Sequence, residues 1–97
     1  MIDKKEIRIL IVDDEEETRE IFQRKLSKTY QTETASSVDK ALVVLEKETF
    51  HLILTDLVMP EKSGIDFLTL IKEKYPYIPV IVISGNASLS MVVKAMQ

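Results

Sequence analysis

Three aspartates stand where apolar runs of the sequence end. Asp13 and Asp14 follow the largely apolar run 7–12, and Asp56 follows the run 52–55. Short runs that are apolar on both faces are typical of strands buried between helices. If these two strands are parallel neighbours, the three carboxylates meet at one edge of the sheet. Three like charges stay together only when they are protonated or share a cation.

The donor atoms in this set indicate which cation would bind. Carboxylate oxygens suit a hard cation, and Mg²⁺ typically takes one or two carboxylates and keeps several waters. The chain has no cysteine, so a thiolate site is excluded. His51, the single histidine, is expected to face solvent at the start of its strand, because no second histidine stands beside it. We therefore expect a Mg²⁺ site with a carboxylate close to the metal.

Composition limits what kind of protein this is. A length of 97 residues fits one small domain, which we take as residues 1–97. The net charge of −3 gives no support to nucleic-acid contact, which needs a basic patch. No apolar stretch approaches the roughly 20 residues of a membrane span. The first residues lack the apolar core of a secretory signal, so a cytoplasmic location is the default expectation.

Strands and helices are expected to alternate along the chain. The expected strands cover 7–12, 30–35, 52–55 and 80–83. The expected helices cover 15–28, a segment from Ser36 or Ser37 through Leu45, 64–75, and a last segment that begins at Ser88 or Ser90. Short connections and right-handed crossovers make this a parallel sheet with helices on both faces. The predicted fold class is α/β, a flavodoxin-like doubly wound sheet of strand order 2-1-3-4, which places the first and third strands side by side.

Taken in series, the motifs at the strand ends resemble the receiver domain of two-component response regulators. They are Asp13-Asp14 after Val12, the segment DLVMPEKSG at 56–64, and Ser84-Gly85 after the fourth strand. The resemblance extends over all 97 residues in order and spacing. It implies that Asp56 accepts a phosphoryl group from a histidine kinase or a phosphotransfer protein. The chain would then be a signalling domain and not an enzyme, beyond phosphorylating and dephosphorylating itself.

The resemblance also assigns a role to each metal ligand. It implies that Asp14 binds Mg²⁺ directly and that Asp13 binds it partly through water. The full expected ligand set is Asp13, Asp14, Asp56 and the backbone carbonyl of Val58.

Further positions would act on the phosphoryl group and on the loops around it. Ser84 would donate a hydrogen bond to a phosphoryl oxygen and so report the phosphorylated state. Gly85 would leave the approach uncrowded, and the resemblance assigns loop support to Pro60, Gly64 and Gly85.

The family pattern continues beyond what this sequence contains. Its fifth strand carries a lysine that contacts the phosphoryl group, and a fifth helix follows. Neither falls within the 97 residues, so we expect a C-terminally incomplete receiver domain, with room for an output domain beyond Gln97. Otherwise the uncharged edge of strand 80–83, or the fourth helix, is expected to pair two copies into a dimer, which sedimentation velocity measures.

Two other function classes stay open at this point. A Mg²⁺-dependent phosphohydrolase also places an aspartate after a buried strand. The haloacid-dehalogenase type would show D-x-D-x-T, however, and this chain has Asp56-Leu57-Val58. The other class is an interaction module with a receiver fold and no phosphorylation. The intact set of three acids argues against that class, and the missing lysine argues for it.

Overall fold

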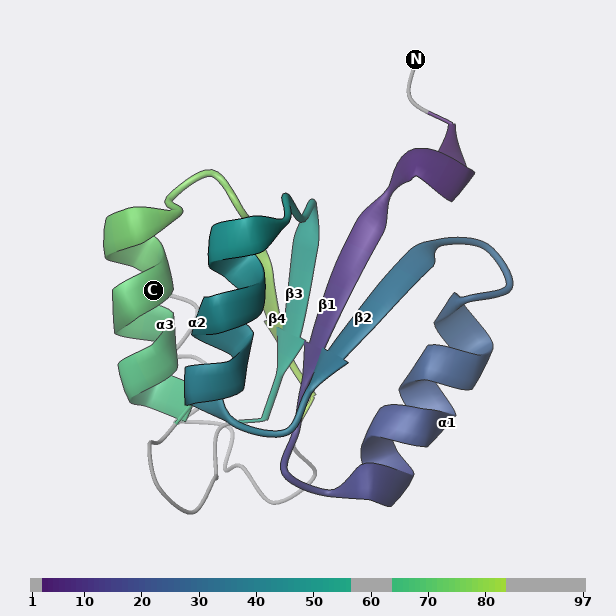
Figure 1. Cartoon of the computed structure of the whole chain (residues 1–97), viewed down its shortest axis with the longest axis horizontal. Coiled ribbons are helices and arrows are strands. Elements are labelled where there is room, and N and C mark those ends of the chain that lie inside the picture. The colour runs from purple at the N-terminus through teal and green to yellow at the C-terminus, as the bar shows by residue number, and fades with distance from the viewer. Residues whose placement is uncertain (1–2, 57–63, 84–97) are drawn as a thin grey trace.

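The computed structural model describes residues 3–56 and 64–83. In these ranges four strands form one parallel sheet in the order β2-β1-β3-β4 (Figure 1). The strands are β1 (Arg8–Val12), β2 (Gln31–Ala35), β3 (Leu52–Thr55) and β4 (Val80–Val82). The predicted α/β class and the strand order 2-1-3-4 are therefore confirmed.

Helices connect the strands as the sequence predicted. They are α1 (Glu16–Leu26), α2 (Val38–Lys47) and α3 (Gly64–Lys74). Ser37 is the N-cap of α2, where its hydroxyl accepts a hydrogen bond from the Lys40 N–H at 3.1 Å. The short 3-10 helix η1 (Lys4–Glu6) was not predicted. The last expected helix, from Ser88 or Ser90, lies outside the described residues.

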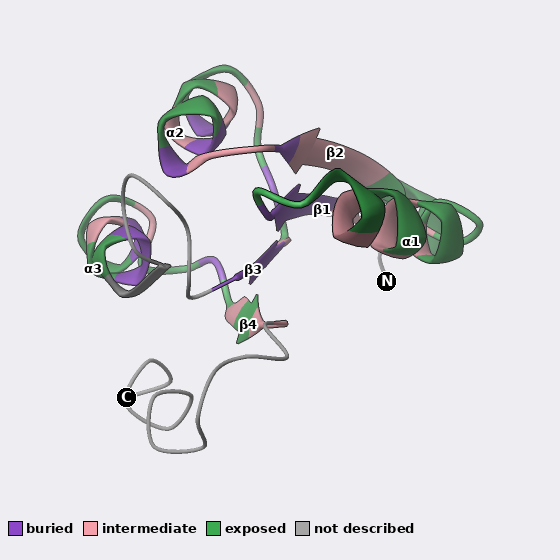
Figure 2. Cartoon of the chain, turned by 90° about the horizontal axis from the view of Figure 1, so that it is seen from below, coloured by how far each residue is buried: buried purple, intermediate pink, exposed green. Residues whose placement is uncertain are grey.

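The helices cover both faces of the sheet, with α1 on one side and α2 and α3 on the other (Figure 2). Side chains alternate along a strand, so Leu10 and Val12 of β1 pack on the side of α2 and α3. Ile9 and Ile11 pack on the opposite side, against α1. This two-sided burial is what the apolar runs predicted. No helix in the described part of the chain has the length and apolar character needed to cross a membrane.

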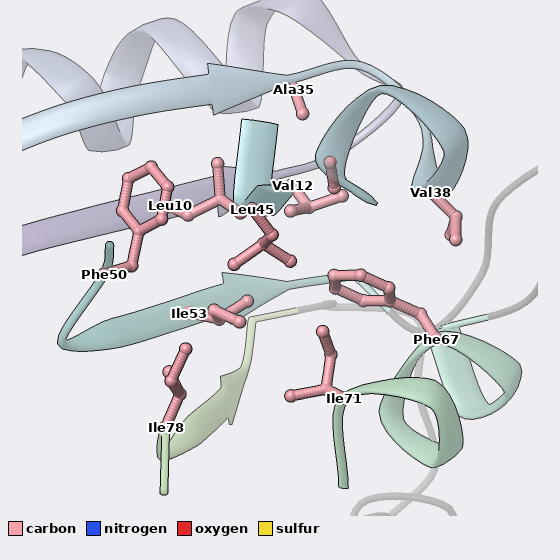
Figure 3. Packing of buried hydrophobic residues seen from close by; sticks show 11 residues of the cluster. Leu10, Val12, Ala35, Val38, Leu45, Phe50, Ile53, Phe67, Ile71 and Ile78 are labelled. Atoms are coloured by element: carbon pink, nitrogen blue, oxygen red, sulfur yellow. The ribbon is translucent and has the colours of Figure 1, made fainter. Parts of the chain in front are cut away.

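The larger of the two hydrophobic cores lies between the sheet and helices α2 and α3. Phe67 and Ile71 of α3 point toward Ile53 of β3, with Leu45 of α2 beside them (Figure 3). All four side chains are buried. These contacts hold α3 against the sheet, and α3 begins eight residues after Asp56.

β4 forms one edge of the sheet as far as the described residues show it. It pairs with β3, and Ile81 is 51% exposed. Pairing of two copies along this edge stays a prediction.

Candidate functional site

The ends of β1 and β3 bring three carboxylates together. Val12 lies opposite Thr55 in the parallel pair, so the residues that follow each strand emerge side by side. One carboxylate oxygen from each of Asp13, Asp14 and Asp56 lies within 4.8 Å of the others. The convergence that the sequence predicted is confirmed.

The backbone of Asp56 is fixed on both sides. Its N–H donates to the Val12 carbonyl oxygen at 3.0 Å, which continues the pairing of β1 with β3. The buried Thr55 hydroxyl donates to the Asp56 carbonyl oxygen at 3.1 Å. Asp56 itself is 8% exposed. Sequence reasoning did not single out Thr55, although a hydroxyl directly before the strand-end aspartate was the available signal.

Asp13 is held at three points. Its N–H donates to the Ala35 carbonyl oxygen at 3.1 Å, and its Oδ1 accepts the Glu15 N–H at 2.9 Å. Its carbonyl oxygen accepts a hydrogen bond from Arg19 Nη1 at 2.7 Å. Asp13 is 3% exposed, whereas Asp14 faces solvent. The two adjacent acids therefore differ in environment: Asp13 is anchored within the fold, and the Asp14 side chain is exposed.

The environment of Asp13 disfavours its charged form. Burial raises the pKa of this carboxyl above its usual value of 3.8, and the negative charges of Asp56, Asp14 and Glu15 raise it further. The hydrogen bond from the Glu15 N–H lowers the pKa but does not reverse the shift. A cation in the cluster would relieve the same repulsion, so this environment suits a divalent metal.

Replacing Asp13 by Asn should stabilise the metal-free protein at neutral pH. The pKa of Asp13 is higher in the folded state than in the unfolded state. Between these two pKa values the folded state binds more protons than the unfolded state does. The free energy of unfolding therefore falls as pH rises through this window. Asn keeps an oxygen for the Glu15 N–H and carries no charge. We expect the free energy of unfolding near pH 7 to rise, by about 0.5–2 kcal/mol as for other single stabilising substitutions. Denaturant unfolding in a chelator, repeated toward pH 4, measures the effect.

The control for Asp13→Asn is Glu46→Gln, which removes one exposed negative charge from α2. It should leave stability within about 0.5 kcal/mol of the wild type. An Asp13→Asn protein that is less stable than the wild type near pH 7 would contradict the proposed repulsion.

The remaining predicted site residues are placed only in part. Gly64 is the first residue of α3. Four positions lie outside the described residues, and their expected roles stay predictions: Val58, Pro60, Ser84 and Gly85. His51 is exposed, as predicted, and its Nδ1 accepts a hydrogen bond from the Arg8 N–H at 3.0 Å. Arg8 is the first residue of β1, and His51 directly precedes β3. The histidine is therefore at the opposite end of these strands from the carboxylates.

The fold and the acid cluster together define a class of domain. It is a flavodoxin-like α/β domain with a cluster of three carboxylates at the carboxyl edge of its sheet, where ligands bind in such folds. A family model described as the response regulator receiver domain matches residues 9–97. The chain belongs to this family, whose members are signalling domains of two-component systems and not classical enzymes. Receiver domains bind Mg²⁺ at an acidic cluster, and this chain has such a cluster.

Curated relatives agree with this assignment. The chain is 36% identical over 89 residues to the response regulator protein PilR of Pseudomonas aeruginosa, covering 91% of this chain and 20% of PilR. It is 33% identical over 95 residues to the alginate biosynthesis transcriptional regulatory protein AlgB of the same species, covering 97% of this chain and 21% of AlgB. The chain thus spans about a fifth of the length of these relatives.

Solved structures are similar in the same way. The signal receiver domain of an HD domain-containing protein from Pseudomonas fluorescens Pf-5 superposes with a TM-score of 0.88 at 27% identity, covering 95% of this chain and 74% of that one. The beryllofluoride-activated NtrC4 receiver domain dimer superposes with a TM-score of 0.84 at 36% identity, covering 92% of this chain and 74% of that one. These matches favour neither the phosphohydrolase nor the interaction module.

Proposed function

We propose that Asp56 is the phosphoacceptor of this receiver domain and that Asp13 and Asp14 bind Mg²⁺ beside it. The observation that carries the proposal is the set of three carboxylate oxygens within 4.8 Å at the ends of β1 and β3. Phosphoryl transfer needs a nucleophile in line with the leaving group and positive charge near the phosphoryl oxygens. Asp56 supplies the nucleophile, and bound Mg²⁺ would neutralise those oxygens.

The covalent step follows from the chemistry of a carboxylate. An oxygen of Asp56 bonds to the phosphorus of a phosphohistidine on a kinase or phosphotransfer protein. The phosphorus–nitrogen bond breaks, its electron pair returns to the imidazole, and an acyl phosphate remains on Asp56. The hydrogen bonds to the Val12 carbonyl and from Thr55 hold the Asp56 backbone still during this exchange.

Further residues and partners complete the proposal. The carbonyl of Val58 would add a metal ligand, and Ser84 would donate to the phosphoryl oxygen. The chain covers about a fifth of AlgB, which is named as a transcriptional regulatory protein. We infer that this receiver domain passes its signal to an output domain outside the 97 residues. A cytoplasmic location stays a prediction.

A small phosphodonor tests the proposal directly. Incubation with acetyl phosphate and Mg²⁺ should add one phosphoryl group per chain, which hydroxylamine should remove because an acyl phosphate is labile to it. Intact mass measures both steps. Omitting Mg²⁺ is the control and should leave the protein unmodified. A chain that gains no phosphoryl group with Mg²⁺ present would contradict the proposal.

Mg²⁺ binding without phosphate should depend on Asp14. Its side chain is exposed, so Asp14→Ala removes a ligand without opening a cavity in the core. We expect the Mg²⁺ affinity to fall by about tenfold or more, as for the loss of other groups that hold a metal. A titration followed by NMR chemical shifts measures the affinity. Glu16→Ala, an exposed acid two residues further along, is the matched control, and equal affinity in wild type and Asp14→Ala would contradict the metal site.

A further inference from the structure

Arg19 connects helix α1 to the acid cluster without joining it. Its Nη1 donates to the backbone carbonyl oxygen of Asp13 at 2.7 Å, a short distance typical of a charge-assisted hydrogen bond. Within the described ranges the guanidinium forms no ion pair with a carboxylate. The contact therefore acts on the position of the Asp13 backbone and is not part of the ligand set.

The other two bonds of Asp13 do not reach α1. The N–H bonds to Ala35 of β2, and Oδ1 accepts from Glu15 in the same loop. Of these three bonds, only the one from Arg19 joins Asp13 to a residue within α1, because Glu15 is the N-cap that precedes the first helical residue. Three carboxylate oxygens within 4.8 Å of one another repel when no metal lies between them, and this repulsion favours a position of the loop further from Asp56. A bond between the loop and the helix opposes that displacement.

We propose that Arg19 is a positioning residue, which holds the loop of Asp13 and Asp14 in its metal-binding geometry before Mg²⁺ arrives. The inference rests on the proposed function of the acid cluster. It adds a residue that touches neither the metal nor the phosphoryl group. Preorganisation of this kind raises affinity because the loop is already ordered when the ligand binds.

Two effects of Arg19 on Mg²⁺ binding have opposite signs, which makes the inference testable. As a positive charge near the site, Arg19 repels the metal, so its removal would tighten binding. As a positioning residue, Arg19 favours binding, so its removal would weaken it. The direction of the change decides between the two.

The chain offers a matched control in Lys40. Arg19 of α1 and Lys40 of α2 line the same open hollow of about 430 Å³, which is also lined by the end of β2. In the described part of the chain, the Lys40 ammonium makes no hydrogen bond or ion pair. Lys40→Gln thus removes the same charge from the same hollow and leaves the Asp13 loop untouched.

The experiment is a Mg²⁺ titration of four proteins by NMR: wild type, Arg19→Gln, Arg19→Lys and Lys40→Gln. We expect Arg19→Gln to weaken binding about tenfold. Arg19→Lys should be intermediate, because an ammonium keeps the charge but lacks the planar fork of the guanidinium. Lys40→Gln should bind as the wild type does or slightly more tightly. Amide exchange in the metal-free proteins should be faster at Glu15 in Arg19→Gln, since its acceptor on Asp13 is less fixed.

Each other outcome has a defined meaning. Equal or tighter Mg²⁺ binding by Arg19→Gln overturns the inference, and so does weaker binding with unchanged Glu15 exchange. If Arg19→Gln does not fold, Arg19→Lys carries the same test, and wild-type affinity and exchange in that variant overturn the inference. Absence of Mg²⁺ binding in the wild type would overturn the proposed metal site instead. In that case the exchange data on the metal-free proteins still decide whether Arg19 fixes the loop.

Discussion

Replacing Asp56 by Asn should abolish the addition of a phosphoryl group from acetyl phosphate. Asn has nearly the same shape, and its backbone can keep the bonds to Val12 and Thr55, so the fold should persist. An amide oxygen is a poor nucleophile, however, and the amide cannot form the acyl phosphate that the carboxylate forms. We expect no detectable modification by intact mass, against one phosphoryl group on the wild type.

The control for this experiment changes an aspartate outside the cluster. Asp39 lies in the first turn of α2, and the Asp39→Asn protein should gain one phosphoryl group as the wild type does. Modification that survives in Asp56→Asn would place the nucleophile elsewhere. Peptide mapping of the modified protein would then identify it.

Replacing Phe67 by Ala should cost about 3–5 kcal/mol of folding free energy. Phe67 is 0% exposed, and its ring packs in the core shared by α2, α3 and the sheet (Figure 3). Removing the ring leaves a cavity that the rigid sheet can close only in part. Because a domain has about 5–15 kcal/mol of net stability, this single change would remove a large share of it. Denaturant unfolding measures the loss.

Tyr77→Ala is the matched control for Phe67→Ala. Tyr77 is also aromatic but is 70% exposed, so its truncation should change stability by no more than about 0.5 kcal/mol. A Phe67→Ala protein as stable as Tyr77→Ala would contradict the packing of α3 against the sheet. In the expected outcome, Phe67→Ala also loosens α3, the helix that begins eight residues after Asp56.

The sequence by itself determined the fold class and the composition of the acid cluster. The run 52–55 has no charged residue on either face, which predicts a strand covered by helices on both sides. The structure places this strand, β3, inside the sheet. Asp13, Asp14 and Asp56 stand directly after such runs, which fixes them to one edge once the strands are parallel. Ser37, one of the two serines at which the sequence predicted the start of this helix, is the N-cap of α2. These features depend on patterns within a few residues, and such patterns can be read along the chain.

Only the tertiary structure decided how the members of the cluster differ. Asp13 and Asp14 are the same residue type in adjacent positions, yet one is buried and the other exposed. That difference arises because Asp13 bonds to Ala35 of β2, which is distant in the sequence, and to Arg19, one turn into the helix that follows. The same holds for Arg19, whose bond to Asp13 depends on the angle at which α1 leaves the sheet. No local pattern encodes that angle, since it results from the packing of Phe22 and Leu26 of α1 against Ile9 and Ile11 of the sheet.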